Sequence, residues 1–117
     1  MTAVDAGREG CCMVVTTAPS REEAEGLAEG ILSNRLAACV QMTEVRSFFL
    51  WEGELQREPE TLLLIKTTDA AYRRLEEYIR QFHSYEVPEI IRLPVTGGLE
   101  GYLDWVRGVT VRPSEGG

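Results

Sequence analysis

The strongest constraint on the fold is a tight turn at Glu52-Gly53 that separates two long segments rich in strand-forming residues. Glycine accepts the positive φ angle that a two-residue hairpin loop requires. One arm spans residues 36–51 and ends in Phe48-Phe49-Leu50-Trp51, and the return arm spans residues 54–67. Pro59 interrupts the return arm and cannot donate to a strand ladder, so it indicates an edge or a bulge. The sequence therefore predicts one long β-hairpin.

A strand and a helix precede the hairpin. Residues 11–17 form a β-rich apolar run that ends at Ala18-Pro19, which is typical of a strand. Ser20, with Glu23 three positions later, predicts a capping box at the start of a helix. Apolar residues then recur at helical spacing, and we expect the helix to end near residues 33–34.

A second helix and a fourth strand follow the hairpin. Asp69 is expected to be the N-cap of this helix. Its predicted buried stripe consists of Tyr72, Leu75, Ile79 and Phe82, with Ala71 and Tyr78 beside it. Pro88 and the residues before it break the helix, residues 89–95 predict the strand, and a short closing helix is expected around residues 102–106.

The order of elements predicts the fold class. Strand, helix, two strands joined by a long hairpin, helix and strand make an α+β, ferredoxin-like βαββαβ sandwich, here followed by a short C-terminal helix. Right-handed crossovers place both main helices on the same face of the sheet. We expect a flexible N-terminus at residues 1–10, a single domain at residues 11–112 and a flexible tail at residues 113–117.

The strands carry more apolar residues than one covered face requires. A half-exposed strand alternates apolar and polar residues, but residues 62–65 are apolar at four successive positions, and residues 48–51 are apolar on both faces. Leaving such groups in water forfeits about 1.5–3 kcal/mol for each side chain. We therefore expect another copy of the chain to cover the second face. The alternative is that the hairpin folds over its own sheet.

Composition restricts the partners and the compartment. The chain carries 12 basic and 19 acidic residues, a formal net charge of −7. This charge repels phosphate groups, so we expect neither nucleic acid nor a membrane surface as a partner. No apolar run approaches the roughly 18 residues of a membrane span, and the N-terminal residues lack the apolar core of a signal peptide, which predicts a cytoplasmic location. The three cysteines are expected to be small buried apolar residues rather than a disulfide framework.

Several short motifs occur in a fixed order between Val14 and Val106. They are Thr17-Ala18-Pro19, Leu36-Ala37-Ala38-Cys39-Val40, Trp51-Glu52-Gly53, Ile65-Lys66-Thr67 and His83-Ser84-Tyr85-Glu86-Val87-Pro88-Glu89, with Tyr102-Leu103 and Trp105 near the end. Each motif alone is weak, but the ordered set closely resembles the CutA family of divalent-cation tolerance proteins. The resemblance implies a homotrimer whose long hairpins cross between subunits, with an architecture like that of the trimeric PII signalling proteins. That second likeness is one of fold and not of function.

The resemblance also implies a connection with copper and other divalent metals. Copper binding is attributed to some members through a cysteine and two consecutive histidines. In this chain Thr16 occupies the cysteine position and Phe82-His83 occupies the histidine positions, while Ser84 replaces the proline usually found before the tyrosine. One of the three attributed ligands is therefore retained.

His83, the sole histidine, is the first candidate metal ligand. A site needs three or four ligands, and Glu89 and Cys39 are the candidates to complete it with copper or a similar divalent ion. The alternative is a histidine at a helix end, satisfied by local hydrogen bonds. A nucleophile–base pair of Cys39 and His83 is a further alternative, but the apolar sequence around Cys39 favours a buried neutral thiol, and no set of residues predicts an enzyme.

A cleft between subunits is the second candidate site. Its predicted residues are Trp51, Glu60, Lys66, Tyr85 and Tyr102, and the alternative is that they only pack at the interface. Lys66 is expected to pair with Glu60 or Glu89 across a subunit boundary rather than to bind an anion. The sequence as a whole predicts a cytoplasmic homotrimer concerned with divalent-metal tolerance. The alternative is a metal-independent signalling or scaffold trimer that binds a small molecule or a partner protein in its clefts.

Overall fold

The computed structural model describes residues 9–110 and has the predicted α+β architecture. Its elements are β1 (Cys11–Ala18), α1 (Arg21–Ser33), β2 (Cys39–Trp51), β3 (Glu54–Thr68), α2 (Asp69–Phe82), β4 (Ile90–Pro94) and α3 (Glu100–Val109). The predicted tail at 113–117 and residues 1–8 of the predicted flexible N-terminus lie outside the described residues. Glu9 and Gly10 are held by hydrogen bonds: Glu9 Oε2 accepts from Ala70 N at 2.7 Å, and Gly10 O accepts from Asp69 N at 2.9 Å.

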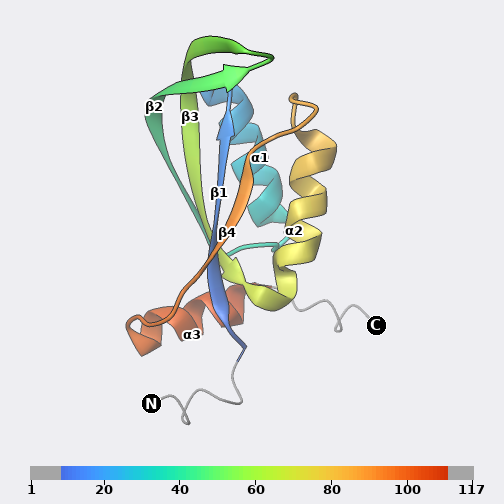
Figure 1. Ribbon diagram of the computed structural model, residues 1–117. Coiled ribbons are helices and arrows are strands. Elements are labelled where there is room, and N and C mark those ends of the chain that lie inside the picture. The colour runs from blue at the N-terminus through green and yellow to red at the C-terminus, as the bar shows by residue number, and fades with distance from the viewer. Residues whose placement is uncertain (1–8, 111–117) are drawn as a thin grey trace.

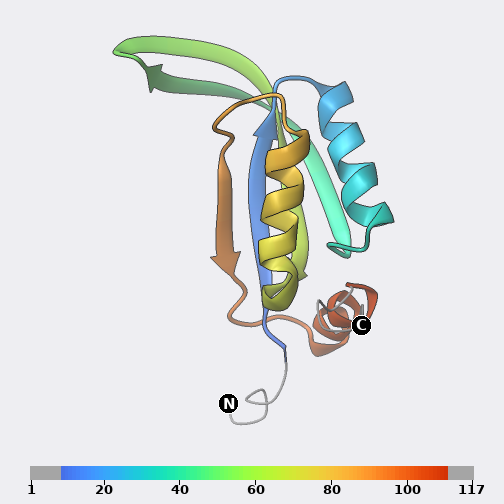
Figure 2. The same ribbon diagram turned by 90° about the vertical axis from the view of Figure 1, so that its right-hand side faces the viewer.

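The four strands form one antiparallel sheet in the order β2-β3-β1-β4. Helices α1 and α2 lie together on one face of this sheet, as the right-handed crossovers predict, and α3 lies at one end of it (Figures 1 and 2). This arrangement confirms the ferredoxin-like βαββαβ prediction. None of the helices within residues 9–110 combines the length and the apolarity needed to cross a membrane.

The hairpin of β2 and β3 reaches beyond the other strands and bends near its end (Figure 1). Glu52 has a φ angle of 53° and Gly53 one of 82°, and Trp51 pairs with Glu54, as a two-residue hairpin turn requires. Pro59 pairs with Arg46 in an unbroken register, beyond the point where β1 ends opposite Thr61. Of the two predictions for Pro59, the edge is the one observed, because β3 has a single neighbour there.

The start of α1 shows half of the predicted capping box. Ser20 Oγ accepts a hydrogen bond from Glu23 N at 3.1 Å, so the N-cap is as predicted. The Glu23 carboxylate does not return to the cap: its Oε2 accepts from Ser84 N at 2.9 Å, on the loop that follows α2. The Glu23 side chain, expected to complete the cap, therefore makes a tertiary contact to this loop instead.

Two predicted boundaries were wrong. Thr68, and not Asp69, is the N-cap of α2, because Thr68 Oγ1 accepts from Ala71 N at 3.2 Å. The second strand begins at Cys39 rather than at residue 36, because Arg35 has a φ angle of 54° and Leu36 N donates back to Ile31 O at 3.0 Å. Residues 36–38 are instead a buried connection.

The main core lies between the sheet and the pair α1–α2. Its buried members include Val14, Leu27, Ile31, Leu63, Ile65, Leu75 and Ile79. The predicted stripe of α2 is confirmed at Leu75 and Ile79, and Tyr72 packs against it partly buried. Phe82 was wrongly placed in the stripe, because its side chain is 55% exposed and contacts the Tyr78 ring at a centroid distance of 4.6 Å.

The opposite face of the sheet is covered at one end only, where Val106 of α3 packs with Cys11 and Ala38. Away from α3, Ile91 is 48% exposed and Leu93 43% exposed. The hairpin does not fold back to cover this surface, since Phe48, Leu50 and Trp51 are themselves exposed. Residues 9–110 of one chain therefore leave the second face open. We call this surface, comprising Met13, Val15, Leu62, Leu64, Ile91 and Leu93, the open face.

Candidate functional site

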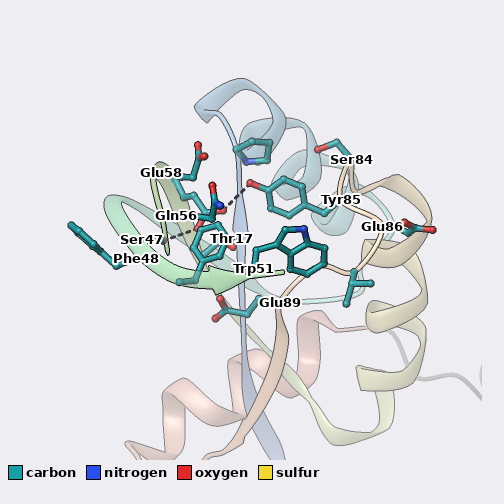
Figure 3. A pocket seen from close by; sticks show the side chains of 14 residues that line it. Thr17, Ser47, Phe48, Trp51, Gln56, Glu58, Ser84, Tyr85, Glu86 and Glu89 are labelled. Atoms are coloured by element: carbon teal, nitrogen blue, oxygen red, sulfur yellow. Dashed lines mark hydrogen bonds between the residues drawn. The ribbon is translucent and has the colours of Figure 1, made fainter. Parts of the chain in front are cut away.

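A cavity of about 890 Å³ lies between the bent end of the hairpin and the loop that follows α2 (Figure 3). Its lining residues are Thr17, Pro19, Ser47, Phe48, Phe49, Trp51, Gln56, Glu58, Glu60, Ser84, Tyr85, Glu86, Val87 and Glu89. Three parts of the chain meet there: the end of β1, the far part of the β2–β3 hairpin, and residues 84–89. The volume is in the usual range for a site that takes a small molecule.

Glu60 is the buried polar centre of this cavity. It follows Pro59 on β3, one position beyond the last residue that pairs with β1, and only 7% of its surface is exposed. Glu60 Oε1 accepts from Ser47 Oγ at 2.6 Å, and Glu60 Oε2 accepts from Tyr85 Oη at 2.8 Å (Figure 3). Two neutral hydroxyl groups from different segments therefore hold one buried carboxylate.

Tyr85 shows the electrostatic character of the cavity. Burial, followed by the hydrogen bond to Glu60 and the charge of that carboxylate, raises the pKa of Tyr85 to about 12. Glu58 and Glu23 add to the effect from further away. Burial makes the largest contribution to this shift, and the negative charges of the neighbouring carboxylates account for only a part of it.

Aromatic rings form the apolar part of the lining. Trp51 and Tyr85 point into the cavity from opposite sides, one from the hairpin and one from the loop (Figure 3). Trp51 is 56% exposed in the single chain. The cavity thus combines carboxylates with flat apolar surfaces, and none of its described lining residues is basic.

His83 lies behind the cavity wall with its side chain buried and both ring nitrogens occupied. Its Nδ1 accepts from Tyr85 N at 3.0 Å, and its Nε2 lies 2.6 Å from Thr17 O. Because a backbone N–H can only donate and a carbonyl can only accept, the ring carries its proton on Nε2, which donates to Thr17 O. The ring also contacts Tyr85 at a centroid distance of 4.9 Å. His83 therefore positions the loop that carries Tyr85.

The predicted ligands His83, Glu89 and Cys39 do not form a cluster. Within residues 9–110 no group of three or more histidine, cysteine, aspartate or glutamate side chains could hold a metal ion. Thr17, next to the His83 ring, is opposite Leu62 on β3, whereas Cys39 is opposite Lys66. The two positions are four residue steps apart along β3, about 13 Å. The same separation removes Cys39 and His83 as a nucleophile–base pair.

The three positions of the attributed copper site do not fit a copper ion in this chain. Thr16 is fully buried, and its hydroxyl, which has no hydrogen-bond partner in the described structure, is a poor ligand for a soft metal. Phe82 has no ligand atom, and the His83 ring has no free lone pair because Tyr85 N donates to it. The histidine satisfied by local hydrogen bonds is the alternative that the geometry supports.

The residues predicted for a cleft separate into two groups. Trp51, Glu60 and Tyr85 line the cavity, and Glu89 joins them. Lys66 and Tyr102 lie at the other end of the sheet: Lys66 pairs with Cys39 across the strands, and the Cys39 thiol, after burial, helps to raise the pKa of Tyr102. Lys66 Nζ donates to Gln41 Oε1 and forms no described ion pair with Glu60 or Glu89.

Two of the three cysteines are buried as the sequence predicts, and Cys39 is not. Cys11 and Cys12 are buried, and burial raises the pKa of the Cys12 thiol to about 12 and that of Cys11 in the same direction. Both thiols are therefore protonated and unreactive near neutral pH. Cys39 is half-buried.

Ser47, Glu58 and Glu86 of the cavity were missed in the sequence. Ser47 and Glu58 sit opposite each other on the hairpin, and Glu86 belongs to the loop, so no local spacing joins them. Their approach depends on the bend of the hairpin towards the loop.

Comparison with known proteins places the chain among proteins of similar sequence and shape. Residues 12–109 match the family model described as CutA1 divalent ion tolerance protein. The divalent-cation tolerance protein CutA of Thermus thermophilus is 43% identical over 96 residues, covering 81% of this chain and 93% of that protein. The chloroplastic protein CutA of Arabidopsis thaliana is 41% identical over 99 residues, covering 84% of this chain but only 54% of that protein. The crystal structure of CutA1 from Oryza sativa superposes with a TM-score of 0.86 at 38% identity, covering 88% of this chain and 95% of that one.

Proposed function

Since the chain belongs to the CutA1 family of divalent ion tolerance proteins, we propose that it serves divalent-cation tolerance as a cytoplasmic homotrimer. The observation that carries this proposal is the open face. A connected apolar surface that the chain's own helices and hairpin leave exposed indicates a protein partner. A second and third copy of the chain are the economical partners, because each brings a hairpin with Phe48, Leu50 and Trp51 exposed.

Sedimentation equilibrium of the purified protein tests the assembly. We expect three times the mass of one chain at micromolar concentration. Leu93→Asp places a charge on the open face and is expected to dissociate the trimer, because a buried unpaired carboxylate is strongly unfavourable. Leu99→Asp is the matched control, since Leu99 is more exposed and lies outside the open face. A monomeric wild-type protein, or equal dissociation in both variants, would contradict the proposal.

The family name supports tolerance of divalent ions, and copper is the ion that we propose. The geometry around His83 argues that tolerance does not depend on copper held by that ring. Copper titration by calorimetry of wild type and His83→Ala, side by side, tests this point. We expect equal and weak binding. Tight binding in wild type that is lost in His83→Ala would show that the ring exchanges its backbone partners for the metal.

The alternative function is a metal-independent signalling or scaffold trimer that binds a small molecule or a partner protein. The cavity between the hairpin and residues 84–89 favours it, since its lining is built from three segments around a buried carboxylate. Growth of a deletion strain in graded copper separates the two functions. Restored tolerance with the wild-type gene, but not with Leu93→Asp, supports the tolerance role of the trimer. Unchanged sensitivity in the deletion strain favours the alternative.

We also propose that the protein is not an enzyme, because the distance between Cys39 and His83 removes the strongest nucleophile–base pair. A thiol reagent applied to the folded protein tests the role of Cys39. The cytoplasmic location is supported by the three free cysteines, which a reducing compartment maintains. Fractionation of cells that express the tagged protein is the direct test, and it matters because the name of the Arabidopsis relative places that protein in the chloroplast.

A further inference from the structure

The cavity beneath the hairpin carries charge of one sign only. Glu58, Glu60, Glu86 and Glu89 line it, and no lysine, arginine or histidine is among its described lining residues. A concave surface lined with charges of one sign concentrates the field inside it and attracts counter-ions. The raised pKa of Tyr85 agrees with a negative potential at this place.

Glu60 lines this cavity and has no cationic partner among the described residues. Its surface is 93% buried, and both of its described partners, Ser47 and Tyr85, are neutral hydroxyl groups. Burying a carboxylate is unfavourable unless a cation or several donors compensate it. An ionised carboxylate has about four lone-pair sites, and the two hydroxyl groups use two of them. Glu60 can therefore still accept hydrogen bonds from a cation that enters the cavity.

The aromatic rings complete the recognition of such a cation. Phe48, Phe49, Trp51 and Tyr85 all line the cavity. The face of an aromatic ring attracts a guanidinium or ammonium group, and the attraction grows when water is excluded. The hairpin already shows this chemistry within the chain, because the Arg57 guanidinium lies over the Phe48 ring at 5.8 Å from its centroid.

We propose that the cavity is a binding site for a small organic cation that carries a guanidinium or ammonium group on a short apolar chain. The cationic group pairs with Glu60, and the apolar chain lies against Trp51 and Phe49, which share one face of the hairpin. A bare metal ion fits less well, because no group of three ligating side chains converges within residues 9–110. An anion is disfavoured by the four carboxylates, and a neutral ligand leaves Glu60 without a counter-charge.

N-butylguanidinium and N-butylurea form the decisive pair of probes. The two molecules have nearly the same shape, and only the first is charged. Calorimetry on the assembled wild-type protein is expected to detect binding of the guanidinium compound and at least about tenfold weaker binding of the urea, as expected for loss of a charge-assisted hydrogen bond. Equal binding of both compounds, or no binding of either at millimolar concentration, overturns the proposal.

Tryptophan fluorescence places the ligand in this cavity. The chain has two tryptophans, and Trp105 lies on α3 at the other end of the sheet. Trp105→Phe leaves Trp51 as the only reporter, and N-butylguanidinium is expected to change its emission with the affinity that calorimetry gives. Binding by calorimetry without a change at Trp51 places the ligand elsewhere and overturns the proposal.

Two carboxylate variants test the role of Glu60. Glu60→Gln is expected to weaken the guanidinium compound at least about tenfold, because the charge-assisted bond is lost while the side-chain shape stays. Glu44→Gln is the matched control: Glu44 lies on the same hairpin but contacts Arg21 and Thr61 on the side of α1, and we expect unchanged affinity. Equal loss in both variants overturns the proposal.

Should Glu60→Gln fail to fold by circular dichroism, the wild-type comparison of the two probes still decides, and Glu89→Gln replaces the variant. Glu89 is exposed and lines the same cavity, so its loss is expected to weaken binding by a few fold. None of these measurements depends on metal tolerance, which growth in copper tests separately. They are made on the assembled protein, whose mass sedimentation gives independently.

Discussion

Leu63 and Leu64 are consecutive residues of β3, yet the sheet gives them different surroundings. Leu63 faces α1 and α2 and has no exposed surface, whereas Leu64 points to the open face and is half-buried. The chain uses the same side chain on both faces because strand residues alternate. One face has its cover within the chain, and the described residues leave the other partly exposed. The difference supports the proposed assembly.

The largest effect is expected from truncating the residue that faces the helices. Leu63→Ala should lower the free energy of unfolding by about 2–5 kcal/mol, since it leaves a cavity in a closed core. Leu64→Ala should cost about 1 kcal/mol in dissociated subunits, where the side chain is only half-buried. Urea unfolding at two protein concentrations measures both. The cost of Leu64→Ala should grow with concentration and that of Leu63→Ala should not; identical behaviour would remove the distinction between the faces.

Trp51→Ala tests the far end of the hairpin. If partner subunits bury this ring, the variant should lose about 3 kcal/mol of stability per subunit in the assembled protein. The measurement is thermal unfolding followed with sedimentation. Trp105→Ala is the comparison, because Trp105 is also half-exposed but lies on α3. A loss for Trp51→Ala within the scatter of surface substitutions would mean that the hairpin end is not interfacial.

Ser20→Ala tests the helix-covered face of the sheet, with a smaller expected loss in the free energy of unfolding. The Ser20 hydroxyl caps α1 through Glu23 N, and its removal should cost about 1 kcal/mol in urea unfolding. The cost should be the same at low and high protein concentration, since α1 packs within its own chain. Ser33→Ala, at the last residue of α1, is the control and should have little effect.

The last prediction concerns pH. The pKa of Tyr85 is raised from 10.0 to about 12, so the folded state favours the neutral phenol. Its contribution to stability is complete below pH 10 and is lost as the pH rises towards 12. Relative to Tyr85→Phe, wild type should therefore lose stability across this interval in urea unfolding at successive pH values. Glu60→Gln should lower the pKa of Tyr85, because it removes the charge that contributes to the shift. A parallel pH dependence in wild type and Tyr85→Phe would contradict this cause.

Local signals in the sequence predicted most of the fold. The glycine at the hairpin turn, the serine N-cap and the spacing of apolar residues in α2 each act over a few residues, so they can be recognised without the structure. The errors arose at the ends of helices and strands. Thr68 displaced Asp69 as the cap, and the positive φ angle of Arg35 delayed β2 to Cys39. Phe82 continues the helical spacing but lies past the edge of the core.

The candidate site was predictable only in part. Trp51, Glu60, Tyr85 and Glu89 were all singled out by sequence motifs or by their chemistry, and the fold brings them to one cavity. Lys66 and Tyr102 were joined to them by the same reasoning, although they belong to the opposite end of the sheet. Motifs indicate that residues matter, but they do not give the distance between them.

The sequence by itself determined the order of the elements, the long hairpin and the surplus of apolar residues that predicts a partner. Only the tertiary structure decided what His83 and Glu60 do. His83 contacts Thr17 O across 66 residues of chain, and Glu60 meets Tyr85 across 25. Such contacts depend on how the hairpin bends and where the loop after α2 lies, which no local pattern encodes. The physical reason is that turns and helices form between near neighbours, whereas a buried carboxylate is satisfied by whichever donors the packed chain brings to it.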